Sequence, residues 1–471
     1  MTGFSVADTL VELGAEVLVI AASASPERTM LLSVIGAELI ERPDLDAPPT
    51  RLADFAPELV VVSPGYRPDH PLIEWAVSHD VPVWGDVELA WRVRDKVGAA
   101  ADWITVTGTN GKTTTVQLAA SMLAGAGLRV APCGNIGVPV LDAVRDPQGF
   151  DVLVVELSSY QLHWINRNAG GELSPFSSVC LNVAEDHLDW HGSFEEYRNA
   201  KAKVYQNTRV ACVYNRDDST TENMVRDAEV VEGARAIGFG LSVPGPSDLG
   251  VIDGIVVDRA FLDDRLTRAI ELTTLDELAA VGLAAPHVVS DVVAAAALAR
   301  SRGVGADVIH DVLAAFALDA HRIEVVLDEA GIRWIDDSKA TNPHAAAASL
   351  SAFPSVVWIV GGLLKGVDID SLVRSNAARL RAAVIIGANR DAVRESFRRH
   401  APLLPVYEVE AAESADVMPT AVGFARDIAQ PGDTVLLAPA AASMDQFADY
   451  AERGRLFQSA VRDAATDGTN E

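Results

Sequence analysis

Short apolar runs alternate with amphipathic segments along most of this chain. The apolar runs have the length of buried strands, and the segments between them, such as RDAVRESFRRHA at 390–401, have the charge pattern of surface helices. This alternation is typical of βαβ units and parallel sheets, so the pattern predicts an α/β fold. The apolar runs form three groups, at 16–20 and 58–65, at 103–108, 151–159 and 178–183, and at 355–362, 382–389 and 434–440.

The three groups of runs predict three domains. A chain of 471 residues exceeds what one hydrophobic core usually organises, and the gaps between the groups place boundaries near residues 97 and 318. The expected domains are residues 1–97, 98–318 and 319–471. The last residues, TDGTNE, are expected to form a frayed tail.

Composition and charge limit the partners. The chain has 38 Lys and Arg against 66 Asp and Glu, a formal net charge of −28 at pH 7. This balance argues against nucleic acid or an anionic membrane as a partner, so an anionic substrate requires a local basic pocket. No run approaches the ~18 apolar residues of a membrane span, and the N-terminus lacks a signal-peptide pattern. The three cysteines, an odd number without metal-ligand spacing, favour reduced thiols, so we expect a cytoplasmic protein.

The stretch ITVTGTNGKTTT predicts a strand that enters a phosphate-binding turn. Gly108 and Gly111 let several backbone N–H groups point inward, and Lys112 adds a positive charge where the next helix begins. Thr113 offers a hydroxyl to Mg²⁺. The spacing departs from the common G-x-x-x-x-G-K-[ST] loop, because Val106 stands six residues before Lys112. Kinases, motors, switches and ligases all use such loops, so other residues must decide the chemistry.

Three more polar side chains follow predicted strands or lie on a predicted helix. Glu156 stands near the end of the run DVLVVELSS, at the edge where open parallel sheets bind ligands. His187 follows the next strand, and Lys201 lies on an expected helix. Each has an ordinary alternative. Glu156 with Ser158 and Ser159 could belong to a helix cap, His187 alone could be structural, and Lys201 alone could be a solvated charge.

Together and in this order, the motifs resemble the Mur ligases over nearly the whole chain. TGTNGKTTT resembles the family's ATP loop, GNIG at 134–137 its asparagine turn, and DHLDWHGSFEEYRNAK its His-to-Lys segment. HRIE at 321–324, DDSKATNP at 336–343 and LLAPAAASMDQF at 436–447 resemble its C-terminal signatures. The first three motifs are shared with ligases that add other amino acids and with folylpolyglutamate synthases. DSKATN and ASMDQF favour the member that adds D-glutamate.

The resemblance implies an ATP-dependent amide ligation in peptidoglycan precursor synthesis, and so a role in cell-wall biogenesis, cell shape, cell division and the cell cycle. ATP would phosphorylate the alanyl carboxylate of UDP-MurNAc-L-Ala, and the amine of D-glutamate would attack the acyl phosphate through a tetrahedral intermediate. Phosphorylation supplies the leaving group that a carboxylate lacks. We expect a monomer that binds these substrates, without nucleic acid and without insertion into a membrane.

The implied architecture is a Rossmann-like uridine domain, a central P-loop ATPase domain and a C-terminal Rossmann-like domain, each on a mostly parallel sheet. The family's opening strand is nearly absent from this chain, and only Gly3 remains of a G-x-G-x-x-G-like turn. A start assigned too late is one explanation. Alanine also replaces the usual acidic residue after the second strand. We therefore expect Ser63, Pro64, Gly65 and Asp86 to carry more of the UDP contact.

The resemblance also assigns the ATP and metal sites. Arg322 would lie at the phosphates and Asp337 at the ribose hydroxyls. The expected catalytic residues are Lys112, His187, Lys201 and Arg322. The expected ATP-binding residues are Gly108, Thr109, Asn110, Gly111, Lys112, Thr113, Thr114, Asn135, Arg322 and Asp337. Two Mg²⁺ ions, with Mn²⁺ as an alternative, would be held by Thr113, Glu156, His187 and Lys201 as a carbamate.

Lys201 matches the family lysine that CO₂ carbamylates. Burial or nearby cations lower the pKa of a lysine amine, and the neutral amine can react with CO₂. The product replaces a positive charge with a negative oxygen ligand.

D-glutamate would bind the third domain. Lys339, Thr341, Lys365, Ser443 and Tyr450 fall where the family binds this amino acid. Cations suit a substrate with two carboxylates. Tyr450 could instead be a packing residue, and Ser443 could be the N-cap of a helix that starts at MDQFADYAERG.

Three alternatives remain at this stage. A folylpolyglutamate synthase-like ligase shares the ATP loop and the lysine, a small-molecule kinase shares only the loop, and a non-catalytic module would bind ATP without turnover. Val288 and Asp291 stand where Mur ligases commonly have asparagines near the adenine.

Overall fold

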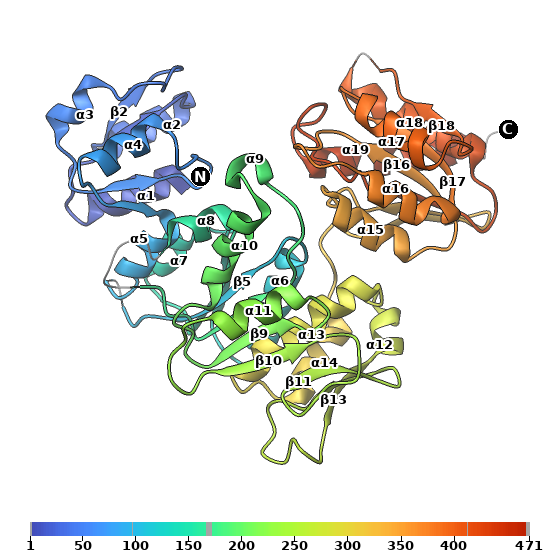
Figure 1. Ribbon diagram of the computed structural model, residues 1–471, viewed down its shortest axis with the longest axis horizontal. Coiled ribbons are helices and arrows are strands. Elements are labelled where there is room, and N and C mark those ends of the chain that lie inside the picture. The colour runs from blue at the N-terminus through green and yellow to red at the C-terminus, as the bar shows by residue number, and fades with distance from the viewer. Residues whose placement is uncertain (1, 97, 166–171, 412, 468–471) are drawn as a thin grey trace. The chain divides into compact units, whose positions relative to one another are not determined.

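The computed structural model describes residues 2–96, 98–165, 172–411 and 413–467 (Figure 1). Among these residues, every helix is too short or too polar to cross a membrane. Contacts divide the chain into two compact units. One unit consists of Met1–Val183, Glu195–Leu278 and Ser290–Phe316, and the other of Ala184–Phe194, Ala279–Val289 and Ala317–Glu471. Residue 97, at the first predicted domain boundary, lies outside the described residues, and the three-domain division stays a prediction.

The first part of the chain carries four short strands in two separate parallel pairs. The pairs are β1 (Leu18–Ala21) with β2 (Glu38–Glu41), and β3 (Val60–Val62) with β4 (Val83–Gly85). A cavity of about 210 Å³ is lined by consecutive positions of both β1 and β3. Because successive side chains of a strand point to opposite faces, a cavity lined in this way lies along the strand edges. No described strand bridges β1 and β3. The helices here are α1 (Thr2–Glu12), α2 (Pro26–Ile35), α3 (Thr50–Phe55), α4 (Pro71–Ser78) and α5 (Asp86–Val93).

The larger sheet has nine strands in the order β13-β12-β11-β10-β9-β8-β5-β7-β6, within the described residues. Its neighbours are parallel except β11 with β12 and β12 with β13. Its strands are β5 (Asp102–Thr107), β6 (Val130–Gly134), β7 (Val152–Glu156), β8 (Ser177–Cys180), β9 (Ala211–Asn215), β10 (Arg235–Phe239), β11 (Asp248–Ile252), β12 (Ile255–Asp258) and β13 (Ile270–Thr274). From β5 the chain crosses to β6 on the β7 side, whereas from β7 it crosses past β5 to β8 on the other side, so connections run in opposite directions on either side of the point between β5 and β8. Open α/β sheets bind ligands at such a point.

The chain between β5 and β14 also carries helices. In chain order they are α6 (Lys112–Gly125), α7 (Val140–Val144), α8 (Ser159–Trp164), α9 (Leu188–His191), α10 (Phe194–Ala202), the 3₁₀ turn Lys203–Tyr205, α11 (Ser219–Asp227), α12 (Leu275–Ala280), α13 (Pro286–Ser301) and α14 (Ala306–Ala315).

The second unit contains a six-stranded sheet in the order β14-β15-β19-β16-β17-β18, in which only β14 and β15 are antiparallel. Its strands are β14 (Glu324–Glu329), β15 (Ile332–Asp336), β16 (Val356–Gly361), β17 (Leu380–Ile386), β18 (Val406–Glu408) and β19 (Thr434–Leu437). Its helices are α15 (Pro343–Ser351), α16 (Asp370–Asn376), the 3₁₀ turn Ala377–Arg379, α17 (Asp391–His400), α18 (Ser414–Ile428) and α19 (Tyr450–Asp467).

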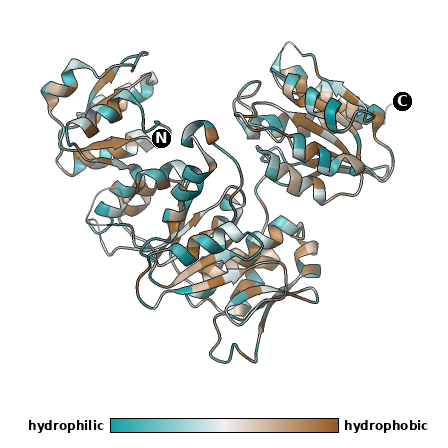
Figure 2. Cartoon of the chain, viewed as in Figure 1, coloured by the Kyte–Doolittle hydropathy of each residue, from teal (hydrophilic) through white to brown (hydrophobic). Residues whose placement is uncertain are grey.

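Both faces of the six-stranded sheet are buried. Trp358 and Val360 of β16 belong to one hydrophobic cluster, together with Phe397 of α17. Val357 and Ile359 belong to another, which includes residues of α18 and α19. This alternation is that of a sheet covered by helices on both sides, and Figure 2 shows the strands as mainly hydrophobic. Continuous apolar runs are the sequence signature of such strands.

The structure confirms the α/β class, since each of the eight predicted apolar runs coincides with a strand. The three cysteines are buried and unbridged, as the composition predicts. The predicted tail is wrong at Thr466 and Asp467, which end α19. This helix packs on the sheet through buried Phe457 and Val461. The packing stabilises the helix as far as its polar last residues, Thr466 and Asp467. Residues 468–471 lie outside the described residues.

Candidate active site

The predicted phosphate loop lies between β5 and α6. Gly108 has φ +153° and Gly111 has φ +84°, and both are tightly surrounded. A Cβ at Gly108 would lie 3.0 Å from the Cβ of Leu181, and one at Gly111 would lie 2.1 Å from Oδ1 of Asp291. The loop therefore requires glycine at both positions. Lys112 Nζ donates hydrogen bonds to the carbonyls of Gly108 and Thr109, both at 2.9 Å.

Two residues that the sequence analysis missed hold this loop. The carbonyl of Asn182 accepts the Thr109 N–H at 2.9 Å. Its side-chain Oδ1 accepts the Asn110 N–H at 2.9 Å, and its Nδ2 donates to the Asn110 carbonyl at 3.2 Å. The hydroxyl of Tyr197, on α10, lies 2.9 Å from Thr109 Oγ1. The hydroxyl of Thr114 is buried and has no hydrogen-bond partner within the described residues. Neither Asn182 nor Tyr197 belongs to the loop motif, so only the fold could identify them.

Glu156 joins the loop to the neighbouring strands. It ends β7 and is 2% exposed. Thr113 Oγ1 donates to its Oε2, and Asn135 Nδ2 donates to its Oε1, both at 3.0 Å. A Cβ at Gly134 would lie 2.4 Å from the Glu156 carbonyl, so the close approach of β6 to β7 needs glycine there. The structure thus brings Thr113, Glu156 and Asn135 together. A carboxylate and a hydroxyl are hard oxygen donors that suit Mg²⁺.

The helix-capping alternative applies to Ser158 rather than Glu156. Ser158 is the N-cap of α8 and forms a capping box with Gln161, while Ser159 is the first helical residue. The carboxylate of Glu156 is bonded to Thr113 and Asn135 instead.

Lys201 is buried beside the phosphate loop. Its side chain on α10 is 2% exposed, and its Nζ donates to the Gly108 carbonyl at 2.7 Å and to Thr107 Oγ1 at 3.4 Å. Its Nζ also lies 4.8 Å from the centre of the Tyr197 ring. The alternative of a solvated surface charge is therefore wrong.

His187 belongs to the second unit. It is the N-cap residue of α9 with φ +54°, and its Nε2 lies 3.5 Å from Oδ2 of Asp186. Its predicted place at the metal stays a prediction.

Arg322 and Asp337 meet in the second unit. Arg322 Nε is buried without a hydrogen-bond partner in the described part of the chain. Asp337 bonds to the Ser349 hydroxyl and accepts the Ile323 N–H at 3.3 Å. Burial raises the pKa of Asp337 to about 6. Burial and the Arg322 charge lower the pKa of nearby His287 to about 4, so this imidazole is neutral at pH 7.

Of the predicted D-glutamate residues, the structure brings Lys339 and Tyr450 together. Lys339 Nζ lies 5.5 Å from the centre of the Tyr450 ring and 3.6 Å from Oδ2 of Asp319. Ser443 is buried, and its carbonyl accepts the N–H groups of Gln446 and Phe447.

The alternative of Ser443 as a helix N-cap is wrong, because the helix that follows begins at Tyr450. Lys365 has φ +53° and closely follows Leu363, which pairs with Ala442 through two backbone hydrogen bonds. The segments that carry Lys365 and Ser443 are thus adjacent. Thr341 donates its N–H to the Lys339 carbonyl at 2.9 Å.

Arg453 is a further residue that the sequence analysis missed. This fully buried side chain of α19 donates to Ser338 Oγ at 2.9 Å, to the Ser338 carbonyl at 2.7 Å and to the Ala441 carbonyl at 3.2 Å. Burial lowers its pKa to about 10. Arg453 therefore ties the loop that follows β15 to the loop that follows β19.

The predicted UDP residues fall at two places. Ser63, Pro64 and Gly65 follow β3, and Ser63 and Gly65 line a surface pocket. Asp86 starts α5, is 3% exposed and accepts a hydrogen bond from Gln161 Nε2 at 3.1 Å. Burial raises its pKa to about 6. Asp86 does not line the pocket with Ser63, so its UDP contact stays a prediction.

Two family models match this chain. The model of the Mur ligase middle domain matches residues 106–299, and that of the Mur ligase glutamate ligase domain matches residues 321–441. A Leifsonia xyli subsp. xyli protein named UDP-N-acetylmuramoylalanine--D-glutamate ligase is 69% identical over 477 residues, covering 100% of this chain and 92% of that protein. A Streptomyces avermitilis protein of the same name is 56% identical over 405 residues, covering 86% and 84%.

Solved structures share the fold. MurF ligase from Thermotoga maritima in complex with ADP has a TM-score of 0.57 at 17% identity, covering 95% of this chain and 96% of that chain. UDP-N-acetylmuramate-alanine ligase MurC from Thermotoga maritima has a TM-score of 0.55 at 18% identity, covering 98% and 97%. With two family models matched and a relative 69% identical across 100% of this chain, the chain belongs to the Mur ligase family.

Proposed function

We propose that this ligase adds D-glutamate to UDP-MurNAc-L-Ala and converts ATP to ADP and phosphate. The observation that carries the proposal is the 69% identity, over the whole chain, to a protein named for this reaction. The sequence segments DSKATN and ASMDQF agree with it.

The phosphate loop would hold ATP. Lys112 and the backbone N–H groups of the loop would bind the β- and γ-phosphates, and Asn135 would lie beside the nucleotide. Lys112 already lies over two loop carbonyls, so a small rotation of its side chain would bring its charge to the phosphates.

Thr113 and Glu156 would hold a Mg²⁺ ion at the phosphates, and the contact between them supports this role. The ion would neutralise negative charge that the transferred phosphoryl group brings toward a carboxylate. His187 and a modified Lys201 would serve a second ion, with Mn²⁺ as an alternative.

Lys201 would act as a carbamate. Its neutral amine would attack the carbon of CO₂, so that an N–C bond forms while one C=O π bond breaks onto oxygen, and the amine proton would pass to water, leaving an anionic carbamate. The burial of Lys201 beside the phosphate loop supports a role at this site rather than that of a surface charge. Lys201→Ala should lose activity and regain part of it with an added short carboxylate, while Lys203→Ala should not respond to the carboxylate. Full activity of Lys201→Ala without added carboxylate would contradict this role.

Residues of the second unit would also bind the substrates. Arg322 would bind the phosphates, and its unpartnered buried Nε supports a ligand-facing role. Asp337 would accept the ribose hydroxyls. Lys339, with Thr341, Lys365, Ser443 and Tyr450, would hold the two carboxylates of D-glutamate.

The proposed reaction has two steps. The alanyl carboxylate oxygen attacks the γ-phosphorus, and the bond from that phosphorus to the β–γ bridging oxygen breaks to release ADP. The D-glutamate amine then adds to the acyl carbon, phosphate leaves, and the amine proton is lost. Excluding water from the site would protect the acyl phosphate from hydrolysis.

The test is ADP formation by the purified chain with Mg²⁺, each of the three substrates omitted in turn. We expect activity only with ATP, UDP-MurNAc-L-Ala and D-glutamate together, and none with L-glutamate. Activity with a folate substrate in place of the UDP-sugar would favour a folylpolyglutamate synthase-like ligase. A phosphorylated product without an amine would favour a kinase, and ATP binding without turnover a non-catalytic module.

A further inference from the structure

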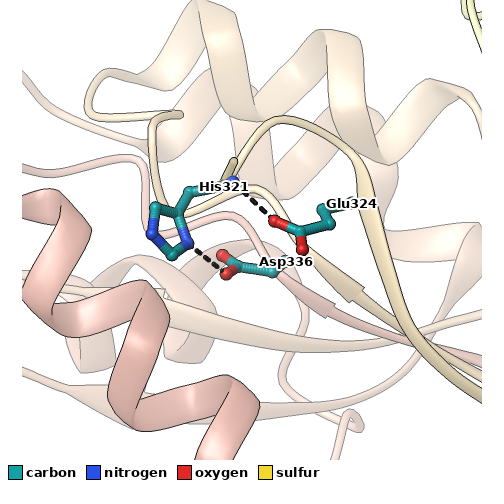
Figure 3. A group of neighbouring side chains, drawn as sticks. All are labelled: His321, Glu324 and Asp336. Atoms are coloured by element: carbon teal, nitrogen blue, oxygen red, sulfur yellow. Dashed lines mark hydrogen bonds and ion pairs between the residues drawn. The ribbon is translucent and has the colours of Figure 1, made fainter. Parts of the chain in front are cut away.

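Four side chains of the second unit form one hydrogen-bonded cluster, which we call the His321 cluster: His321, Glu324, Asp336 and Gln458. His321 Nδ1 lies 2.6 Å from Oδ2 of Asp336, and the His321 N–H donates to Oε2 of Glu324 at 2.8 Å (Figure 3). Gln458 Nε2, on α19, donates to the same Asp336 and Glu324 oxygens, each at 2.9 Å. Asp336 is 0% exposed, His321 6% and Gln458 9%. His321, Asp336 and Gln458 are therefore part of the interior, and Glu324 is half-buried.

The chemistry of the cluster favours a hydrogen-bonded network over a metal site. His321, Glu324 and Asp336 each offer a ligand atom, and these atoms lie within 4.8 Å of one another. Each carboxylate oxygen nearest the imidazole, however, already accepts two hydrogen bonds, and Asp336 Oδ1 accepts the Ser338 N–H at 2.9 Å. A cation would have to displace these donors.

Charge and amide orientation agree with this network. Arg462 donates to Gln458 Oε1 at 3.2 Å, which turns the amide nitrogen toward the carboxylates. The hydrogen bond to Asp336 raises the pKa of His321. Burial lowers it, the charges of Asp336 and Glu324 raise it, and Arg455 lowers it slightly. The imidazole is therefore a hydrogen-bond donor to Asp336.

The cluster holds a backbone turn that would not form by itself. His321 has φ +67° and Ile323 has φ +45°, so left-handed residues flank Arg322 on both sides. The left-handed region costs a non-glycine residue about 1–2 kcal/mol, and a β-branched residue there is an outlier. The His321 carbonyl accepts the Lys339 N–H at 3.2 Å, and the Ile323 N–H donates to Asp337. The turn is thus joined to the loop that carries Asp337.

A glycine of α19 makes room for the imidazole. A Cβ at Gly454 would lie 2.2 Å from Nδ1 of His321, so any larger residue there would displace the ring. Gly454 itself takes no part in the hydrogen bonds of the cluster. It therefore offers a way to move His321 without removing a polar group.

We propose that His321 is a positioning residue: held by Asp336 and Gln458 and seated against Gly454, it fixes the turn that presents Arg322 to the loop that carries Asp337. The inference rests on the proposed function, in which Arg322 and Asp337 bind ATP. In this proposal, the His321 cluster determines the affinity for the nucleotide and the rate of phosphoryl transfer.

The test compares Gly454→Ala with Gly423→Ala in the full chain. Gly423 lies on α18, and a Cβ there would meet nothing within 4 Å. Alanine favours the helix at both sites. Gly454→Ala should raise KM for ATP by about 10- to 100-fold, because misplacing a group by about 1 Å costs up to 10²-fold. KM for UDP-MurNAc-L-Ala should stay within about two-fold, as should every constant of Gly423→Ala, since a substitution away from such contacts changes little.

A second pair covers the case in which Gly454→Ala does not fold. His321→Asn keeps a side-chain donor and tolerates the left-handed backbone, whereas His321→Leu loses both. Asparagine should restore most of the ATP affinity that leucine loses. Equal KM for ATP in Gly454→Ala and Gly423→Ala, or in the two His321 variants, would overturn the proposal. A fall in kcat without a change in KM for ATP would also overturn the proposal, because it indicates only a smaller fraction of folded enzyme.

Failure of the proposed function would look different. If the wild-type chain forms no amide product, MgATP binding measured by calorimetry on the same variants still tests the inference. A weaker affinity in Gly454→Ala than in Gly423→Ala would support the positioning role, and equal affinities would overturn it.

Discussion

Two segments that we expect to bind ATP obtain their shape in different ways. In the phosphate loop, the unusual φ values fall on Gly108 and Gly111, so the sequence itself permits the turn. In the 321–324 turn, the positive φ values fall on His321 and Ile323, and this backbone conformation is unfavourable for both residues. Partners that lie far away in sequence, up to Gln458, hold this turn instead. A local motif therefore identifies the loop, while the turn depends on the fold.

The largest expected effect tests the loop. Lys112→Ala should lower kcat/KM by about 10²–10³-fold, as removal of one preorganised donor at a charged transition state does. Lys96→Ala, at an exposed lysine, is the matched control. Steady-state ADP formation measures both. A Lys112→Ala enzyme with nearly full activity would mean that backbone N–H groups alone hold the phosphates.

The next effect tests the turn. Arg322→Lys keeps the charge but loses the planar fork of donors, and hydrogen bonds to charged groups contribute about 1.5–3 kcal/mol, or about 10- to 100-fold in kcat/KM. Arg333→Lys is the control, because Arg333 is exposed and pairs with Asp328. If Arg322→Lys matches the control, then the turn serves stability and does not present a ligand.

The pH dependence of MgATP affinity tests the role of Asp337, which is joined to the 321–324 turn. The pKa of this buried carboxyl is raised to about 6, so it is protonated in much of the protein below pH 6. A proton on it would oppose hydrogen bonds from ribose hydroxyls, and the affinity for MgATP should fall as pH decreases through about 6. Asp337→Asn should bind more weakly at pH 8 and lose this dependence.

Asp86 provides the control, since burial also raises its pKa to about 6 and it lies in the other unit. Asp86→Asn should leave the nucleotide profile unchanged. A raised pKa favours the folded state at low pH, and this contribution is lost as pH rises through about 6. Both Asn variants should therefore depend less on pH in thermal unfolding between pH 4 and pH 7. A wild-type MgATP affinity that is flat between pH 5 and pH 7 would rule out the assigned role of Asp337.

The smallest effect concerns Asp291, whose Oδ1 approaches Gly111 of the phosphate loop. Asp291→Asn removes a negative charge from the loop and should lower KM for ATP by no more than about five-fold, as for a change of up to 1 kcal/mol. Asp276→Asn, at an exposed position of α12, is the control. A higher KM in Asp291→Asn would instead mean that the carboxylate contributes to nucleotide binding.

The residues that the sequence analysis missed are also defined by contacts with distant parts of the chain. Tyr197 and Asn182 contact the phosphate loop, and Arg453 joins two loops of the second unit, yet none stands in a motif that points to its task. Lys201 has little to distinguish it from a surface lysine until α10 is packed against Gly108.

The sequence by itself determined the parallel sheets and the phosphate loop. Continuous apolar runs are buried on both faces wherever helices cover a sheet, and glycines at two positions permit the positive φ values that the loop needs. Only the tertiary structure decided how the turn at Arg322 is held. A left-handed histidine and isoleucine are unfavourable in isolation, and they persist because Asp336, Gln458 and the bare backbone at Gly454 meet His321 in the folded chain.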